Sequence, residues 1–189
     1  YSLGSVDNVL LGIDATMRFG QTTLYAQLML DELSLVELRA KSGWWATKYG
    51  LQAGIKQRLQ NRLGSWFLRG EINTARPYTY SHLSLDQSYT HRGNVLAHPL
   101  GANFAEILAE AKWENKKWIS EVFASYSLKG FDTDSINYGG NIYIPYINRL
   151  GDYGHTIGQG KGNNAFILIG RLSRKIAGGG IQFFAEGQY

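Results

Sequence analysis

The stretch LGIDATMRF, residues 11–19, alternates apolar and polar positions without a break. Its odd positions carry only apolar side chains, whereas its even positions include Asp14, Thr16 and Arg18. Successive side chains of a β-strand point to opposite faces, so this period of two predicts a strand with one apolar and one polar face. The same period recurs in residues 23–30, 48–56, 66–72, 105–113, 118–129, 166–172 and 181–189. The sequence therefore predicts an all-β protein with about eight strands of roughly ten residues each.

The connections between these strands alternate between short and long. Tight hairpin turns are expected at residues 20–21, at residues 61–62, in ENKK (residues 114–117) and around Gly178. The long connections run over about residues 31–45, 74–103 and 130–163, and they hold all three prolines and all four histidines. The strands are thus free of proline, and the long loops carry the side chains with the most varied chemistry.

Composition narrows the class of protein. The charged fraction of 18% lies below the usual value for soluble domains, and the 189 residues can form one β domain. No run of lysine and arginine marks a nucleic-acid surface, so a nucleic-acid partner is not expected. The sequence has no cysteine, which excludes disulfides, thiolate metal sites and a catalytic thiol. No apolar run is long enough for a membrane-spanning helix.

Two solvents can face the apolar rows of such a sheet. In a soluble barrel or sandwich these rows fill the interior, whereas in an outer-membrane barrel they face lipid. The rows hold no charged residue, and long loops alternate with short turns as in membrane barrels. Aromatic residues of the rows mark both ends of the strands, which fits two membrane interfaces: Phe19, Trp66, Trp113 and Trp118 near the short turns, and Tyr49, Tyr126, Phe166 and Tyr189 near the long loops. The pattern favours an antiparallel transmembrane β-barrel in the outer membrane of a Gram-negative bacterium, with a soluble β fold as the alternative.

The expected strand directions place both ends of the chain on the side of the long loops. Bacterial barrels normally keep their ends in the periplasm. Residues 1–189 are therefore expected to form a single segment of a larger barrel, and this segment is expected to lack the N-terminal part of that barrel. Closure by these eight strands alone is an alternative, with an interior filled by side chains. The predicted lumen face includes Phe67, Phe123, Ile167 and Phe184 among its charges, which suits a lumen partly plugged by protein.

Catalytic and metal-binding patterns in the loops are incomplete. SYTHRGN (residues 88–94) has Gly93 where a serine nucleophile would follow His91, and Ser81 beside His82 is only a neighbour in the chain. DTDSIN (residues 132–137) departs from the calcium-loop pattern at Ile136. We therefore expect no enzymatic activity, no metal site and no cofactor.

Aromatic and amide-rich loops suit carbohydrate, because a tyrosine or tryptophan pairs a flat apolar face with a polar edge. RPYTYSH (residues 76–82) and LAHPLGANF (residues 96–104) are the densest such segments. The alternative is that the aromatic residues pack the loops over the barrel mouth. The candidate glycan-binding residues are Trp44, Trp45, Arg76, Tyr78, Tyr80, His82, His91 and His98.

Residues 75–106, with RPYTYSH and LAHPLGAN as their main blocks, resemble outer-membrane barrels of the capsule-assembly Wzi type, in the gliding-motility RemB-like branch. Residues 24–33, 43–56 and 153–160 are similar more loosely. The resemblance implies a barrel of about eighteen strands, of which this chain is a C-terminal portion. It also implies a non-enzymatic role in the assembly or attachment of capsular or surface polysaccharide, or in gliding motility. A channel, or a partner of motility or secretion proteins, is the alternative function.

Overall fold

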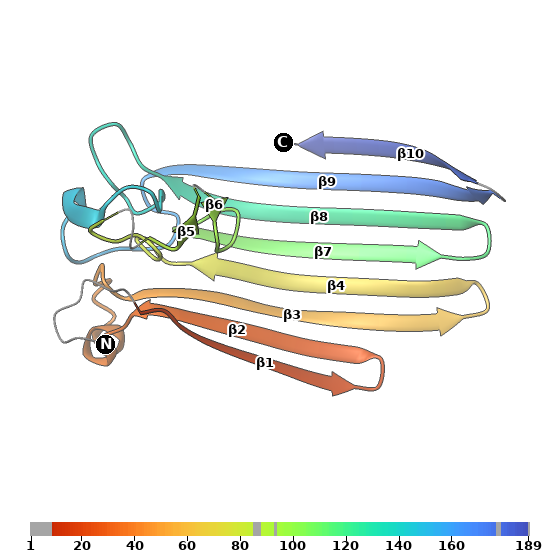
Figure 1. Cartoon of the computed structure of the whole chain (residues 1–189), viewed down its shortest axis with the longest axis horizontal. Helices are drawn as coiled ribbons and strands as arrows, with labels where there is room; N and C mark the ends of the chain where they lie inside the picture. Colours follow the sequence, from red (N-terminus) through yellow and green to blue (C-terminus); the bar gives the residue numbers. More distant parts are fainter. Residues whose placement is uncertain (1–8, 85–87, 93, 177–178, 189) are drawn as a thin grey trace.

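The large sheet dominates the computed structural model shown in Figure 1, which describes residues 9–84, 88–92, 94–176 and 179–188. Within these ranges, eight strands form one antiparallel sheet in chain order. The all-β architecture expected from the sequence is therefore confirmed. The strands are β1 (Leu11–Phe19), β2 (Thr22–Glu32), β3 (Lys48–Asn61), β4 (Gly64–Ala75), β7 (Phe104–Glu114), β8 (Trp118–Phe131), β9 (Lys161–Ile176) and β10 (Gly179–Gln188).

Short turns join the strands at one end of the sheet and long loops at the other, as expected (Figure 1). The turn around Gly178 lies outside the described residues. β1 and β10 have 9 and 10 residues, as predicted, whereas the strands between them are longer and β9 reaches 16. Backbone pairing continues beyond the apolar rows into the polar stretches at the strand ends, where the apolar period no longer marks a strand.

The three long loops pack into one body, which we call the loop cap and which comprises the described residues of 33–47, 76–103 and 132–160. It contains a short helix, α1 (Leu35–Ala40), a two-residue hairpin, β5 (Thr90–His91) with β6 (Asn94–Val95), and a 3-10 turn, η2 (Tyr146–Asn148). Ser34 caps α1 by accepting a hydrogen bond from the backbone N–H of Glu37. The sequence analysis missed these elements, because each is too short to show a period.

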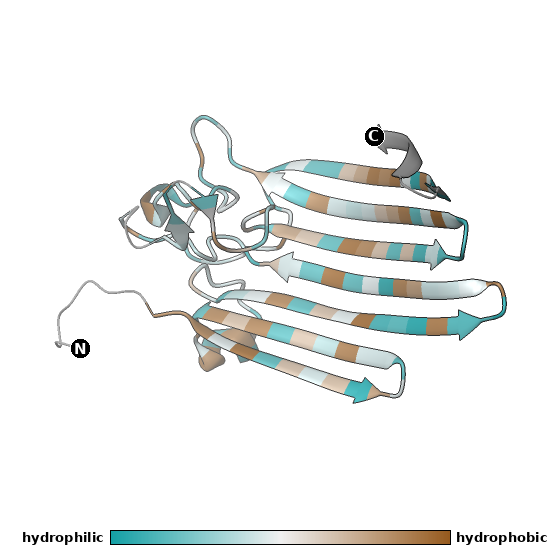
Figure 2. Cartoon of the chain, turned by 45° about the vertical axis from the view of Figure 1, so that its right-hand side comes forward, coloured by the Kyte–Doolittle hydropathy of each residue, from teal (hydrophilic) through white to brown (hydrophobic). Residues whose placement is uncertain are grey.

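The register of the sheet gathers the apolar rows on one face. Leu28 lies opposite Leu51, Ile72 opposite Ile107, and Tyr126 opposite Phe166. Brown and teal segments alternate along the strands in Figure 2. This apolar face is exposed at Leu11, Ile13, Met17, Phe19, Leu24, Leu51, Ile55, Leu59, Trp66, Leu68, Ile72, Ile107, Val122, Tyr126, Phe166, Leu168 and Leu172.

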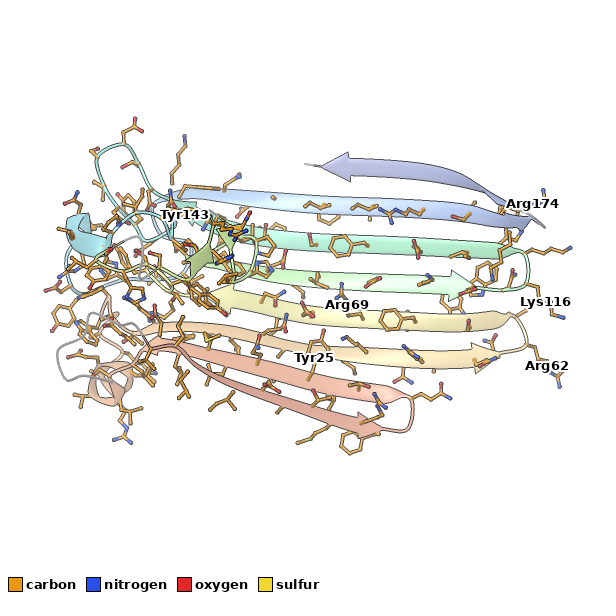
Figure 3. All side chains as sticks on the ribbon, viewed as in Figure 1. Tyr25, Arg62, Arg69, Lys116, Tyr143 and Arg174 are labelled. Carbon is orange, nitrogen blue, oxygen red and sulfur yellow. The ribbon has the colours of Figure 1, made fainter. Side chains whose placement is uncertain are left out.

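The opposite face is polar, and its side chains form ion pairs and hydrogen bonds between strands. Arg69 pairs with Glu110 at 3.0 Å, and Lys112 with Glu121 at 2.8 Å. Tyr25 donates a hydrogen bond to Glu71, and Figure 3 labels Tyr25 and Arg69 midway along the sheet. Three of the four apolar residues expected on this face, Phe67, Phe123 and Ile167, are half-buried there, while the side chain of Phe184 lies outside the described ones.

The buried core lies where the loop cap meets the sheet. Its cluster consists of Ala75, Tyr80, Ala102, Phe104 and Ile142. Among the described strands, β1 pairs only with β2 and β10 only with β9, so the sheet is open at both edges. Closure of a barrel by these eight strands alone is therefore not what the structure adopts. No described helix is long and apolar enough to cross a membrane.

Asn103 ties two segments of the cap to the end of β8. It is fully buried and adopts a left-handed backbone with φ of 57°, which asparagine tolerates better than most residues. Its amide nitrogen donates to the carbonyl oxygens of Gly130 at 3.1 Å and Gln159 at 2.9 Å, and its oxygen accepts from the N–H of Gly158 at 2.7 Å. The side chain therefore satisfies backbone groups that burial would otherwise leave unpaired.

We expect the substitution Asn103→Ala to lower the free energy of unfolding by about 2–4 kcal/mol, because it leaves several buried polar groups without partners. Thermal unfolding of the purified protein, together with protease cleavage of the cap, measures this effect. Asn163→Ala, at an exposed position of β9, is the control and should change neither. Equal stability of the two variants would contradict the role given to Asn103.

Candidate functional site

The segment RPYTYSH is the interior of the loop cap. Tyr78 and Thr79 are fully buried, and Ser81, Tyr80 and His82 nearly so. Tyr78 and Tyr80 adopt positive φ angles of 64° and 71°, which bulky side chains rarely do. The backbone N–H of Tyr78 donates to Gly139 at 3.1 Å, and that of Tyr80 to a carboxylate oxygen of Asp31 at 2.9 Å. Strain of this kind persists only where surrounding contacts fix the backbone.

A β-bulge places Asp31 in the cap. The register of β2 with β3 shifts between Leu30 and Glu32, so Asp31 falls between paired residues. Its carboxylate lies 3.0 Å from Nε2 of His82, and both side chains are nearly inaccessible to solvent. Bulges commonly redirect a side chain in this way. Asp31 thus links the end of β2 to the RPYTYSH segment through both a backbone and a side-chain contact.

Lys48 is a fully buried cation next to this pair. Its ammonium lies 3.1 Å from Glu32 and donates to the carbonyl oxygen of Ser81 at 3.1 Å. It also lies over the rings of Trp45 and Tyr146, at 5.1 and 4.5 Å from their centroids. A buried charge needs such compensation, because removing it from water is costly. Lys48 is therefore a structural cation of the cap.

Trp44 and Trp45 are half-buried, and the ring of Trp45 lies beside Lys48. The ring of Trp45 packs on that of Tyr146 at 4.5 Å, and the guanidinium of Arg149 lies 4.3 Å from its centroid. Trp44 packs edge-on against Trp45. Arg76 donates to the carbonyl oxygens of His155 at 3.2 Å and Trp44 at 3.4 Å. Nη2 of Arg76 thus bonds to the backbone of the cap, whereas its buried Nε has no hydrogen-bond partner among the described residues.

A cavity of about 240 Å³ lies between the loop of residues 76–103 and the polar face of the sheet. Tyr80 and Tyr89 stack at 5.6 Å on its loop side, and burial raises the pKa of Tyr80 to about 12. Its other linings are Gln27, Met29, Gly50, Leu51, Gln52, Asn73, Thr74, Ala75, Leu96, Ala97, His98 and Phe104. This cavity combines aromatic rings with amide groups from three strands.

His98 lies at the junction of cavity and cap. Its ring stacks on Phe104 at 4.6 Å, and its Nε2 lies 3.1 Å from Glu106. Its Nδ1 accepts a hydrogen bond from the backbone N–H of Leu100 at 3.2 Å. Desolvation holds the pKa of His98 below its ordinary value, against the opposing effect of Glu106.

The structure brings together only part of the glycan-binding set predicted from sequence. Five of the set lie together in the cap: Tyr78, His82 and Arg76 in its interior, with half-buried Trp44 and Trp45 beside them, where the ring of Trp45 packs edge-on against Tyr78 and the carbonyl oxygen of Trp44 accepts from Arg76. His91 is exposed on β5, whereas Tyr80 and His98 line the cavity.

Sequence reasoning did not single out Asp31, Lys48, Asn103 or the cavity amides. Asp31 lies near the end of β2 and Lys48 begins β3, so the two residues flank a long loop. Two residues of opposite charge on either side of a loop were the signal that could have identified them. Within the described residues, no group of three or more histidine, aspartate or glutamate side chains is placed to hold a metal ion.

No family model, no curated protein and no solved structure matches this chain.

His98 makes stability dependent on pH. Because the pKa is lower in the folded protein, the unfolded chain binds more protons near pH 6, and stability falls as pH drops below the ordinary histidine value of about 6.5. We expect the thermal midpoint to fall between pH 7.5 and pH 5.5, and His98→Gln to reduce this fall. His91→Gln, at an exposed histidine, is the control and should leave it unchanged. The same pH dependence in the wild type and His98→Gln would refute this prediction.

Proposed function

We propose that this chain is a segment of a transmembrane β-barrel in the outer membrane of a Gram-negative bacterium. The exposed apolar face carries the proposal. It is continuous from β1 to β9 and larger than a soluble monomer ordinarily leaves in water. Spanning strands of about 9–11 residues cross a bilayer when tilted, and the strands of this sheet have that length or more. Arg174, on the same face, lies at the hairpin end beside Trp118, as snorkelling cations do.

The open edges support a barrel larger than this chain. In hydrocarbon an unpaired edge leaves backbone N–H and C=O groups without partners, each at a cost of several kcal/mol. We therefore propose that further strands pair with β1 and β10 and close the barrel, with the polar face toward the lumen and the loop cap on the outer side. Outer-membrane lipid is then the partner of the apolar face.

For the role of the barrel, we propose the non-enzymatic assembly or attachment of capsular or surface polysaccharide, or gliding motility. The resemblance of residues 75–106 to Wzi-type barrels supports this role, and so does the aromatic loop cap. The alternative is a channel or a partner in translocation or secretion. Charged pairs along the polar face, such as Arg69 with Glu110, favour that alternative, because they suit an aqueous lumen.

Lipid exposure can be tested with adjacent residues of β1 that lie on opposite faces. We expect Ala15→Lys to weaken assembly into the membrane by about 2–4 kcal/mol, because it places a charge in hydrocarbon. Thr16→Lys, on the polar face, should assemble normally. Folding of the full-length protein into vesicles, followed by heat-dependent gel mobility, measures both. If both lysines are tolerated equally, the apolar face does not meet lipid.

The polysaccharide role can be tested in cells that lack the full-length parent protein. We expect these cells to shed polysaccharide that the wild type retains, and a plasmid copy should restore retention. Cell-bound and released polysaccharide are quantified, with Thr16→Lys as an assembled control. An unchanged coat would favour the alternative role, and a steady single-channel current through the purified barrel would then identify a channel.

A further inference from the structure

The cavity beneath the loop of residues 76–103 has unused hydrogen-bonding capacity. Gln27 is exposed on the polar face and makes no side-chain hydrogen bond to the described residues. The amide nitrogen of Gln52, which also lines the cavity, donates to Glu71 and Asn73, and its oxygen makes no hydrogen bond to the described residues. Such amides can bind a ligand hydroxyl as donor and as acceptor.

The aromatic wall adds flat surface and a hydroxyl donor. Tyr80 and Tyr89 stack with an interplanar angle of 30°. A Cβ atom at Gly50 would lie 2.5 Å from the hydroxyl oxygen of Tyr80, so the glycine gives this hydroxyl its place at the cavity floor. A tyrosine hydroxyl is protonated at neutral pH, and burial raises the pKa of Tyr80 further, to about 12.

The carboxylates around the cavity already have hydrogen-bond partners. His98 pairs with Glu106 at 3.1 Å, and Glu71 accepts hydrogen bonds from Tyr25, Gln52 and Asn73. The described residues that line the cavity include no lysine or arginine, so a ligand carboxylate buried there would lack a cationic partner among them, which would be costly. The volume of about 240 Å³ lies below the range of pockets for drug-sized ligands, which suits a single small ring.

We propose that this cavity binds one neutral pyranose ring, with Tyr80 and Tyr89 on its apolar side and the amides of Gln27 and Gln52 on its hydroxyls. The proposal rests on the polysaccharide role and deepens it by naming the class of sugar. In this proposal the sugar is recognised in the cavity between cap and sheet. Arg76 and His82, the partners predicted from the sequence, instead make contacts inside the cap.

The test uses the full-length protein in a detergent without a sugar headgroup. Binding of methyl glucoside, methyl galactoside, methyl mannoside and methyl glucuronide is measured by calorimetry. We expect at least one neutral glycoside to bind, and the glucuronide to bind at least tenfold more weakly. Failure of all three neutral glycosides, or equal binding of the glucuronide, would overturn the proposal.

Variants locate the site. Tyr89→Leu and Gln27→Leu should each weaken binding about three- to tenfold, as expected for the loss of one stacking or hydrogen-bonding partner. Tyr153→Leu, exposed in the cap, and Gln60→Leu, exposed near a hairpin turn, are the matched controls and should bind as wild type. If the cavity variants also bind as wild type, the sugar lies elsewhere and the proposal fails.

Two further comparisons separate this proposal from the proposed function. If an oligosaccharide binds as well as its monosaccharide, the ligand is the end of a polysaccharide chain. If only the monosaccharide binds, the ligand is a free sugar. Sugar binding by purified protein with an unchanged coat on deletion cells would support the cavity and reject the polysaccharide role. Shedding by deletion cells without binding of any neutral sugar would support the role and reject the cavity.

Discussion

The register of the sheet is the constraint on which the rest of the structure depends. From β1 to β9 the antiparallel pairs keep most apolar residues opposite apolar or small ones, as at Ala15 with Ala26 and Ala53 with Ile72, although Leu68 lies opposite Gln57. A slip of one residue in any pair would turn that strand's charged side chains, such as Arg69 in β4, onto the apolar face. The shift recorded between β2 and β3 lies at the very end of β2, beyond the apolar row. The two faces therefore stay chemically distinct across the sheet.

The loop cap follows a different principle, because its interior is largely polar. Lys48, Asn103 and the Asp31–His82 pair are all buried, and each has partners for its charge or amide groups. Such contacts contribute modest net stability, yet an unmatched partner costs much more. The cap can therefore adopt few arrangements other than the observed one. This specificity holds three loops, distant in sequence, in fixed positions over the end of the sheet.

The sequence predicts the sheet far better than the cap. A period of two is a local signal, and it was enough to place the strands, the hairpins and the two faces. The inward position of Asp31 depends on a bulge, and the positive φ angles of Tyr78 and Tyr80 depend on contacts with Asp31 and Gly139. Contacts between residues so far apart leave no local pattern. For the same reason the sequence indicated a dense aromatic segment but not that Tyr78 is inside and Tyr80 at a cavity wall.

The position of the cavity follows from the meeting of these two parts. The sheet supplies amides at fixed spacing along its polar face, and the cap supplies aromatic rings whose backbone is fixed by buried contacts. Gln27 and Gln52 lie on neighbouring strands in direct register, while Tyr80 is anchored through its N–H to Asp31. The register fixes the strand amides and Asp31 fixes the backbone of Tyr80, so a ligand at the proposed site would not have to order these groups. The buried residues of RPYTYSH thus act mainly by holding Tyr80 in place, and the segment's density of polar and aromatic side chains reflects that task.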